Sequence, residues 1–324
     1  LEIRESLAEM DGRSASLQDL NISYNKVGDI CMIEGGEENL RKAREMYERS
    51  LEIVEELAET ERRSESLRDL SISYNKVGDI CERQGGKENL RKAREMYERG
   101  LEIRESLAET ERRSESLRDL SISYERVGDI CMIEGGEENL RKAREMYERS
   151  LEIVKELAET EGRSESLWEL SVSYERVGDI CERQGGEENL RKAREMYERG
   201  LEIRESLDET EGRSERLREL SVSYERVGDI CERQGGEENL RKAREMYERN
   251  LEIAKSLAET EKTITAYDDL AVALFKVAMH PFTSDYIRKR YIKEMKTIAE
   301  LLYQKTGNPR YQRFMEIAKT ILKY

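Results

Sequence analysis

One twelve-residue sequence, ENLRKAREMYER, occurs five times in this chain at intervals of 50 residues. The copies begin at Glu38, Glu88, Glu138, Glu188 and Glu238. A fixed period of this length is typical of stacked repeat arrays, in which each unit buries its apolar face against its neighbours. The repetition therefore predicts an array of similar units and argues against a single active site.

Apolar residues within each unit recur at helical spacing. In the second unit they follow steps of three and four from Leu67 to Cys81, which places them on one stripe of a helix. We expect this first helix over about 64–84, with Ser64 or Ser66 as its N-cap. The pair Gly85-Gly86 should end the helix, because glycine adopts the left-handed conformation without a Cβ penalty.

A second helix is expected to follow each Gly-Gly turn and, in this unit, to run to about residue 111. Gly12, Gly162 and Gly212 mark its end in three copies, and Arg62 and Arg112 take that place in the others. A short turn between two helices makes an antiparallel hairpin. The chain is therefore predicted to be all-α, a solenoid of helix pairs.

The net charge of −15 is unevenly distributed along the chain. Residues 281–324 carry ten basic and four acidic side chains, a net charge of +6, so the first 280 residues carry −21. A chain this acidic has no general affinity for phosphate backbones, which argues against nucleic acid as a partner. No apolar run is long enough to span a membrane, so we expect no membrane partner.

The five cysteines occupy the same slot in successive units, at Cys31, Cys81, Cys131, Cys181 and Cys231. Equivalent positions of stacked helices lie too far apart for a disulfide, and the spacing matches no metal site. We interpret them as small buried residues. Unpaired thiols favour a reducing compartment, hence the cytoplasm.

The small and aromatic residues of each unit resemble the tetratricopeptide repeat. In the second unit the matching residues are Tyr74, Val77, Gly78 and Cys81 in the first helix, and Ala93, Tyr97 and Gly100 in the second. Phrases such as LSISYNKVGDI are similar to long-repeat bacterial members of that family, although the family period is about 34 and this period is 50. The resemblance implies a right-handed superhelix and a protein-binding role without naming a partner.

The repeat pattern divides the chain into successive parts of one solenoid. Residues 1–13 correspond to a second helix alone, and the start in mid-repeat indicates that the protein continues upstream. Five near-identical helix pairs follow over 14–261, then a divergent sixth pair over 262–307. Residues 308–324 are expected to form a helix that caps the last core edge.

The resemblance implies that the first helices line a concave groove. An aspartate stands at one groove position of every repeat, at Asp29, Asp79, Asp129, Asp179 and Asp229. A row of carboxylates would attract a basic segment of a partner protein. Alternatively, the aspartates are solvated or pair with a neighbouring repeat, which is the more usual role of such residues.

The candidate groove extends beyond the aspartates and becomes apolar towards the C-terminus. Its predicted residues are Asn75, Asp79, Glu82, Arg83, Glu125, Asp129, Glu175, Asp179, Glu225, Asp229, Phe275, Met279 and Phe282. Trp168 replaces a surface arginine, so it is either an interface anchor or, as is more usual, a ring lying across its own helix.

Two further patterns concern the repeats as pairs and the C-terminal charge. Met-Ile pairs at 32–33 and 132–133 either make exposed apolar contacts or pack under the Gly-Gly turn, and Arg104 and Arg204 alternate with valines. A basic cluster is formed by Arg288, Lys289, Arg290, Lys293 and Lys296. This cluster either meets the acidic flank of another molecule or only adds solubilising charge.

No catalytic constellation is apparent in the sequence. His280 is the only histidine, and there is no nucleophile–base pair, phosphate-binding loop or metal-ligand spacing, so we expect no enzyme activity and no cofactor or metal. The leading hypothesis is a cytoplasmic scaffold that binds a basic peptide or helix of a partner protein along an acidic concave groove. The alternatives are a repeat protein that self-assembles head to tail, or the regulatory sensor arm of a larger effector.

Overall fold

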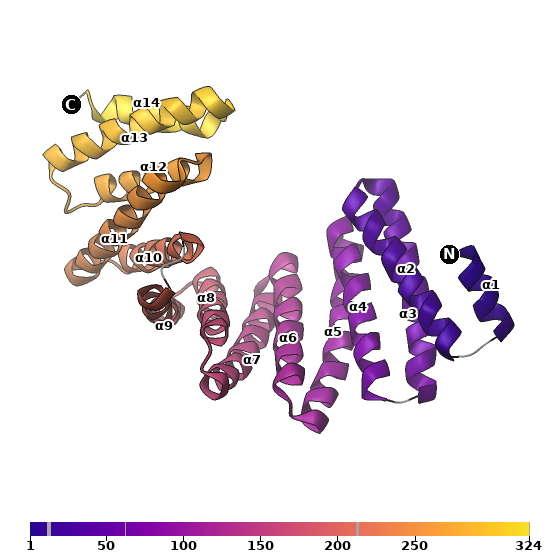
Figure 1. Ribbon diagram of the computed structural model, residues 1–324. Coiled ribbons are helices and arrows are strands. Elements are labelled where there is room, and N and C mark those ends of the chain that lie inside the picture. The colour runs from indigo at the N-terminus through magenta and orange to yellow at the C-terminus, as the bar shows by residue number, and fades with distance from the viewer. Residues whose placement is uncertain (12–13, 62, 212–213, 324) are drawn as a thin grey trace. The chain divides into compact units, whose positions relative to one another are not determined.

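The computed structural model describes residues 1–11, 14–61, 63–211 and 214–323, and these form fourteen α-helices without any strand (Figure 1). The all-α fold predicted from the periodicity is confirmed. The helices group into two compact units, Leu1–Gly162 and Arg163–Tyr324. Within each unit, successive helices pack as antiparallel neighbours.

The N-terminal unit contains a short first helix followed by three helix pairs. Its helices are α1 (Glu2–Asp11), α2 (Ser14–Glu34), α3 (Glu37–Glu61), α4 (Ser64–Gln84), α5 (Lys87–Glu111), α6 (Ser114–Glu134) and α7 (Glu137–Glu161). The bounds of α4 and α5 match the predicted 64–84 and the predicted end near residue 111.

The C-terminal unit contains three helix pairs and a final helix. Its helices are α8 (Ser164–Gln184), α9 (Glu187–Glu211), α10 (Ser214–Gln234), α11 (Glu237–Glu261), α12 (Ile264–Met279), α13 (Asp285–Thr306) and α14 (Pro309–Ile321). The divergent sixth pair and the last helix thus form where the sequence predicts them.

The helix ends follow mainly from glycine. Gly85 and Gly86 have φ values of 66° and 83°, and the N–H of Gly85 donates to the carbonyl oxygen of Cys81. Gly162 ends α7 with φ 59°, whereas Arg112 ends α5 in the same left-handed conformation, φ 48°. The corresponding residues 12, 62 and 212 lie outside the described part of the chain.

The predicted N-cap is wrong. The capping residue of α4 is Arg63, which makes no side-chain cap, and Ser64 is already helical. Ser66 is buried and donates to Oε2 of Glu61 at 2.7 Å, so its hydroxyl fastens the start of α4 to the end of α3. The serine therefore stabilises contact between repeats and not the helix end.

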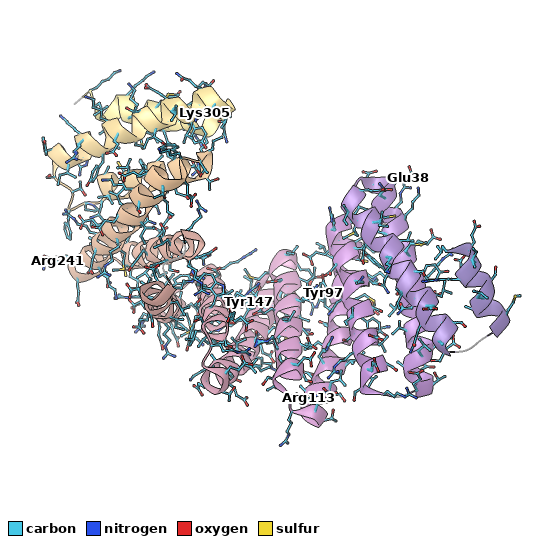
Figure 2. The ribbon with its side chains drawn as sticks, viewed as in Figure 1. Glu38, Tyr97, Arg113, Tyr147, Arg241 and Lys305 are labelled. Atoms are coloured by element: carbon cyan, nitrogen blue, oxygen red, sulfur yellow. The ribbon has the colours of Figure 1, made fainter. Side chains whose placement is uncertain are left out.

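The core of each repeat lies between its two helices. In the second repeat Val77, Cys81 and Ala93 are fully buried. A Cβ on Gly78 would lie 2.5 Å from a ring carbon of Tyr97, so only glycine allows this approach. Figure 2 shows Tyr97 and Tyr147 lying among the helices, in contrast to Glu38 and Arg113 near the helix ends. Small residues such as Gly78 at the predicted positions therefore leave room for the tyrosine ring that recurs in each repeat.

The cysteines are buried and unpaired, as interpreted from their spacing. Burial raises the pKa of the Cys81, Cys131 and Cys231 thiols. No helix within the described ranges is both long enough and apolar enough to cross a membrane.

Candidate partner-binding face

The repeated aspartates join consecutive repeats. Oδ1 of Asp79 on α4 accepts a hydrogen bond from the hydroxyl of Tyr97 at 2.8 Å and an ion pair from Arg126 on α6. Oδ1 of Asp29 accepts in the same way from Tyr47 at 2.7 Å and from Lys76 at 2.8 Å. The open question about these aspartates is thus answered in part, because they do pair with a neighbouring repeat.

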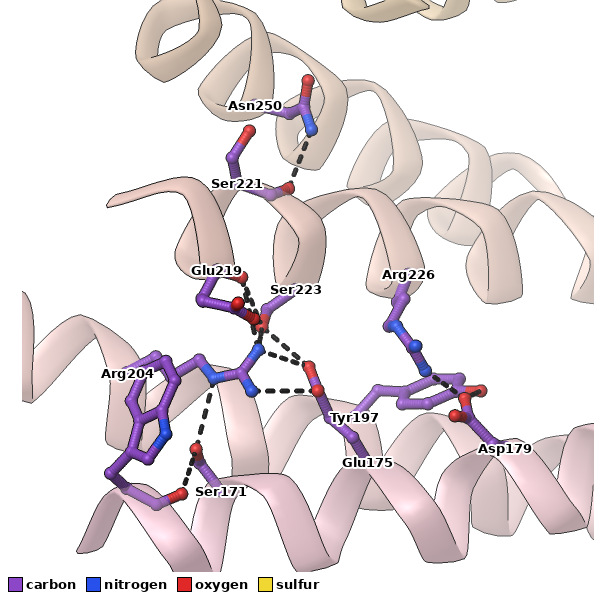
Figure 3. Close-up of polar contacts among 11 residues, drawn as sticks. Ser171, Glu175, Asp179, Tyr197, Arg204, Glu219, Ser221, Ser223, Arg226 and Asn250 are labelled. Atoms are coloured by element: carbon purple, nitrogen blue, oxygen red, sulfur yellow. Dashed lines mark hydrogen bonds and ion pairs between the residues drawn. The ribbon is translucent and has the colours of Figure 1, made fainter. Parts of the chain in front are cut away.

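The same arrangement recurs within the C-terminal unit. Asp179 accepts from Tyr197 and pairs with Arg226, which Figure 3 shows reaching down from the next repeat. Asp229 accepts from Tyr247 at 2.7 Å and pairs with Lys276. In the N-terminal unit, Asp129 likewise accepts from Tyr147 at 2.6 Å. Each aspartate is therefore bound to the tyrosine of its own repeat.

These carboxylates nevertheless keep one side towards solvent. The side chains of Asp29 and Asp79 are 50% and 40% exposed. The bonds described above all end on Oδ1, and among the described residues Oδ2 of either aspartate receives no hydrogen bond. Asp29 and Asp79 thus use Oδ1 to join consecutive repeats and leave Oδ2 without a hydrogen bond within the described residues.

The charge state of this cluster follows from its contacts. Burial alone would raise the pKa of Asp29, but hydrogen bonds from Lys76 and Tyr47 outweigh it and lower that pKa. For Tyr47, burial and the adjacent Asp29 carboxylate raise the pKa of the phenol well above its usual range. The aspartate is therefore charged and the tyrosine neutral at physiological pH.

The predicted groove residues one helical turn earlier contact either the second helix of their own repeat or the first helix of the next one. The hydroxyl of Ser150 on α7 donates to Oε1 of Glu125 at 3.2 Å. Asn75 lies against Gly100 on α5, with its Oδ1 buried. Glu225 lies 3.5 Å from Lys276. These side chains sit at the seam between helices and face a partner only at their edges.

Glu175 is the most enclosed of the predicted groove residues, at 13% side-chain exposure. Both of its oxygens accept from the guanidinium of Arg204, at 2.6 and 2.9 Å. Arg204 is 2% exposed and also donates to the carbonyl oxygen of Glu219 and to the hydroxyls of Ser171 and Ser223 (Figure 3). This buried network joins α8, α9 and α10.

Trp168 covers this network. Its ring lies 4.8 Å from the guanidinium carbon of Arg204 and 5.8 Å from that of Arg216, which is a cation–π arrangement. Trp168 is only partly exposed. Its contacts assign it a packing role within the C-terminal unit and do not require an interface.

The remaining predicted residues lie at the ends of the first helices. Oε2 of Glu82 accepts a hydrogen bond from the hydroxyl of Tyr97 at 2.8 Å. The neighbouring Arg83 is exposed. Phe275 packs on Phe314 of α14, with ring centroids 6.0 Å apart. The final helix therefore covers part of the α12 surface at Phe275, a residue that was predicted to line the groove.

Met279 and Phe282 are exposed at the end of α12, by 45% and 38%. Between them His280 is buried, and its ring contacts Tyr247 and Phe282 edge to face. Burial lowers the pKa of His280. The histidine is therefore a neutral packing residue at physiological pH.

The resemblance to tetratricopeptide repeats also implies a groove position for Ile72, and its counterparts Ile22 and Ile122 occupy the same slot. Ile22, Ile72 and Ile122 are 46%, 45% and 45% exposed. Each stands seven residues, about two helical turns, before Asp29, Asp79 or Asp129 and so lies on the same side of its helix. We call the exposed surface formed by these six residues the α2/α4/α6 face.

The isoleucines of the two Met-Ile pairs are exposed on the same helices as this face. Ile33 is 85% exposed and Ile133 is 51% exposed, so these isoleucines do not pack under the Gly-Gly turn. Ile133 stands eleven residues, about three turns, after Ile122. On α6, apolar side chains therefore flank the central polar positions at both ends. The sequence already places these isoleucines on the polar side of the first helix, away from its apolar stripe.

The acidic residues, cysteines and histidine of the described ranges do not gather into a metal-binding cluster. No cluster of three or more histidine, cysteine or acidic residues within them could hold a metal ion. The polar contacts instead connect helices to each other, and the accessible features are apolar side chains and carboxylate oxygens.

Stability should fall below about pH 4 because ion pairs between repeats depend on ionised glutamates. Burial would raise the pKa of Glu98, but hydrogen bonds from Lys142 and Arg94 lower it, and Glu48 and Glu198 behave alike. Their stabilisation is complete above an unfolded-state pKa of about 4.3 and is lost as pH falls through the lower folded value.

Urea unfolding at a series of pH values between neutrality and strong acid will test this expectation. Replacement of Lys142 by glutamine should reduce the acid dependence, because Glu98 then loses one of its two cationic partners. Equal pH dependence in both proteins would contradict the assignment.

Comparison with known families supports a helical repeat protein. The Sel1 repeat model matches residues 22–52, 71–102, 121–152, 171–202 and 221–249. Each matched segment spans most of the first helix, the Gly-Gly turn and the first part of the second helix. The search of curated proteins gave no match.

Solved structures with this fold include proteins of several kinds. The nuclear import adaptor Nro1 from S. pombe has a TM-score of 0.58 at 10% identity, covering 93% of this chain and 99% of that one. The RpL4 assembly chaperone Acl4 has a TM-score of 0.56 at 11% identity, covering 94% and 96%.

A signal transduction ATPase from Pyrococcus horikoshii, which has a tetratricopeptide repeat sensor, gives a TM-score of 0.52 at 16% identity. The match covers 95% of this chain and 50% of that chain. At these identities the likeness concerns the fold alone. Together with the five matched segments, it shows that this chain is an all-helical, tetratricopeptide-like solenoid protein in which five successive segments match the Sel1 repeat.

Proposed function

We propose that this chain is a non-enzymatic scaffold that binds an extended or helical segment of a partner protein on the α2/α4/α6 face. The observation that carries the proposal is the row of half-exposed isoleucines, Ile22, Ile72 and Ile122, on helices joined by ion pairs. Apolar side chains repeated on a rigid surface are typical of interaction sites. The buried thiols agree with a reducing compartment such as the cytoplasm.

The aspartates add polarity to this surface. Because Lys76 and Arg126 already neutralise Oδ1 of Asp29 and Asp79, the face is less acidic than the sequence implies. Their outward oxygens suit backbone N–H groups or a basic side chain of the partner. We therefore propose a partner segment that combines apolar side chains with hydrogen-bond donors, and a basic segment is one such case.

The experiment first captures the partner and then maps it. A photo-crosslinking amino acid at position 72, in a lysate of the source organism, identifies proteins that touch the face, and the purified partner is then titrated against variants. Ile72→Asp with Ile122→Asp should weaken binding by about tenfold or more, since two apolar contacts are replaced by charges. Folding should be nearly unchanged because both positions are about 45% exposed.

A matched control is Ile264→Asp, which changes an isoleucine of 46% exposure at the start of α12. It should leave partner binding unchanged. Equal loss of binding in the control, or full binding by the Ile72 and Ile122 variant, would exclude the α2/α4/α6 face as the site. The corresponding binding test of Asp79 uses the variant Asp79→Asn. Replacement by lysine would reverse the charge and also break the contacts with Tyr97 and Arg126.

A further inference from the structure

The exposed side of α13 differs in charge from the other second helices. On those helices an arginine pairs with a glutamate four residues before it, at 2.7–2.8 Å for Arg49–Glu45, Arg99–Glu95, Arg149–Glu145 and Arg199–Glu195. In the first half of α13 the exposed cations are Lys289, Arg290 and Lys293. These three form no ion pair or hydrogen bond among the described residues.

The charge spacing on α13 includes one repulsive pair. Lys289 and Lys293 are like charges four residues apart, which destabilises a helix by a few tenths of a kcal/mol, although Asp285–Lys289 and Arg290–Glu294 place opposite charges at the same spacing. Tyr286 continues this stripe towards the start of the helix and is 79% exposed. A basic stripe with an exposed aromatic ring is typical of a surface that meets a partner.

A cleft adjoins this stripe. It has a volume of about 410 Å³ and is lined by Met279, Asp285, Arg288, Lys289 and Ile321, from α12, α13 and α14. Arg288 is held in the wall by the carbonyl oxygens of Ala278 and Thr283 and by the carboxylate of Asp285. The cleft is thus a formed feature with apolar side chains on two walls and Lys289 at its border.

We propose that α13 and this cleft bind an acidic segment of a partner protein, which places carboxylates on Lys289, Arg290 and Lys293 and an apolar side chain between Met279 and Ile321. This site is separate from the α2/α4/α6 face and has the opposite charge preference. It does not depend on the proposed function of that face.

Charge and shape together select this occupant. Nucleic acid phosphates would also meet the cations, but a phosphate backbone has no apolar side chain to place between Met279 and Ile321. A second copy of the chain also has acidic second helices. Those of the complete pairs, α3, α5, α7, α9 and α11, carry no exposed large hydrophobic residue in the described ranges, but α1 exposes Ile3, Leu7 and Met10. Self-association through α1 is therefore the rival occupant that the light-scattering measurement below must exclude.

The test uses the whole chain and a fluorescein-labelled peptide of repeated Asp-Glu-Leu triplets, followed by fluorescence anisotropy. We expect saturable binding that weakens with salt, since exposed charges are screened. Arg290→Glu with Lys293→Glu should weaken it by about tenfold or more. The control, Arg41→Glu with Arg91→Glu, makes the same change in net charge at exposed positions of α3 and α5 and should bind as the original protein does.

Two further peptides test the parts of the proposal. Asp-Glu-Gly triplets keep the charge without an apolar side chain and should bind more weakly, as should the original peptide to Met279→Gln. Equal binding by the Leu and Gly peptides would overturn the role of the cleft. Absence of saturable binding, or binding unaffected by the Arg290 and Lys293 changes, would overturn the proposal as a whole.

Rival occupants are distinguished by the same variants. An oligonucleotide that binds as tightly as the peptide, and loses binding in the Arg290 and Lys293 variant, would overturn the choice of a protein segment. A light-scattering mass that rises with concentration in the original protein but not in that variant would instead show self-association through the basic end. Binding by the Ile72 and Ile122 variant should be normal, which separates this test from that of the other face.

Discussion

Replacing Glu175 by alanine should lower the free energy of unfolding of the C-terminal unit by about 3–5 kcal/mol, the usual cost of leaving one member of a buried ion pair without its partner. Arg204 is 2% exposed, and Glu175 accepts from both terminal nitrogens of its guanidinium. The remaining contacts, to Ser171, Ser223 and the carbonyl oxygen of Glu219, are to neutral groups. Urea unfolding followed by circular dichroism measures the loss.

Two companion variants make this result specific. Glu175→Ala combined with Arg204→Met should recover most of the stability, because a buried pair replaced by apolar groups is often tolerated. Asn75→Ala changes the equivalent residue of the second repeat, where Arg104 pairs with Asp119 instead, and should cost about 1 kcal/mol or less. A double variant no more stable than the single one would show that packing, and not the unpaired charge, causes the loss.

Gly78→Val should cost about 3 kcal/mol, because the new side chain would enter the space of a buried ring. A Cβ at this position would lie 2.5 Å from Cε1 and 2.7 Å from Cδ1 of Tyr97, and Tyr97 is 2% exposed. The ring is further held by its hydrogen bonds to Asp79 and Glu82. The shift should appear as a lower midpoint in urea unfolding of the N-terminal unit.

The matched control lies on the opposite helix of the same repeat. Gly100→Ser introduces the residue found in the same slot at Ser50 and Ser150, and the nearest atom to a new Cβ is Oδ1 of the Asn75 side chain, at 3.1 Å. We expect a change of less than about 1 kcal/mol. If both glycine variants lose equal stability, the close ring contact is not what selects Gly78.

The helix boundaries could be predicted because they depend on local chemistry. Apolar steps of three and four require a helix in any repeat, and Gly85-Gly86 supplies the positive φ that ends it. Ser66 was misassigned because its role is not local: its hydroxyl bonds Glu61 of the preceding helix. A serine near a helix start therefore suggests a cap, whereas its real partner is visible only after the helices have packed.

The candidate binding residues show the same division. The position of Asp79 on the polar side of α4 follows from the helical period, but its ion pair with Arg126 joins residues 47 positions apart. Glu175 resembles Glu125 in sequence, yet it is enclosed because Arg204 occupies the slot that holds Val154 in the preceding repeat. One changed residue on a neighbouring helix alters the environment of an otherwise identical position.

By itself, the sequence determined the repeat, the two helices of each unit, their ends and the small residues that admit Tyr97, because these depend on residues close in the chain or identical in every copy. Only the tertiary structure decided which charged groups remain accessible. Aspartates, glutamates and arginines occur on every helix, and their exposure depends on the side chain that the next repeat brings against them. Isoleucines such as Ile72 became candidates for binding because packing left them about half exposed.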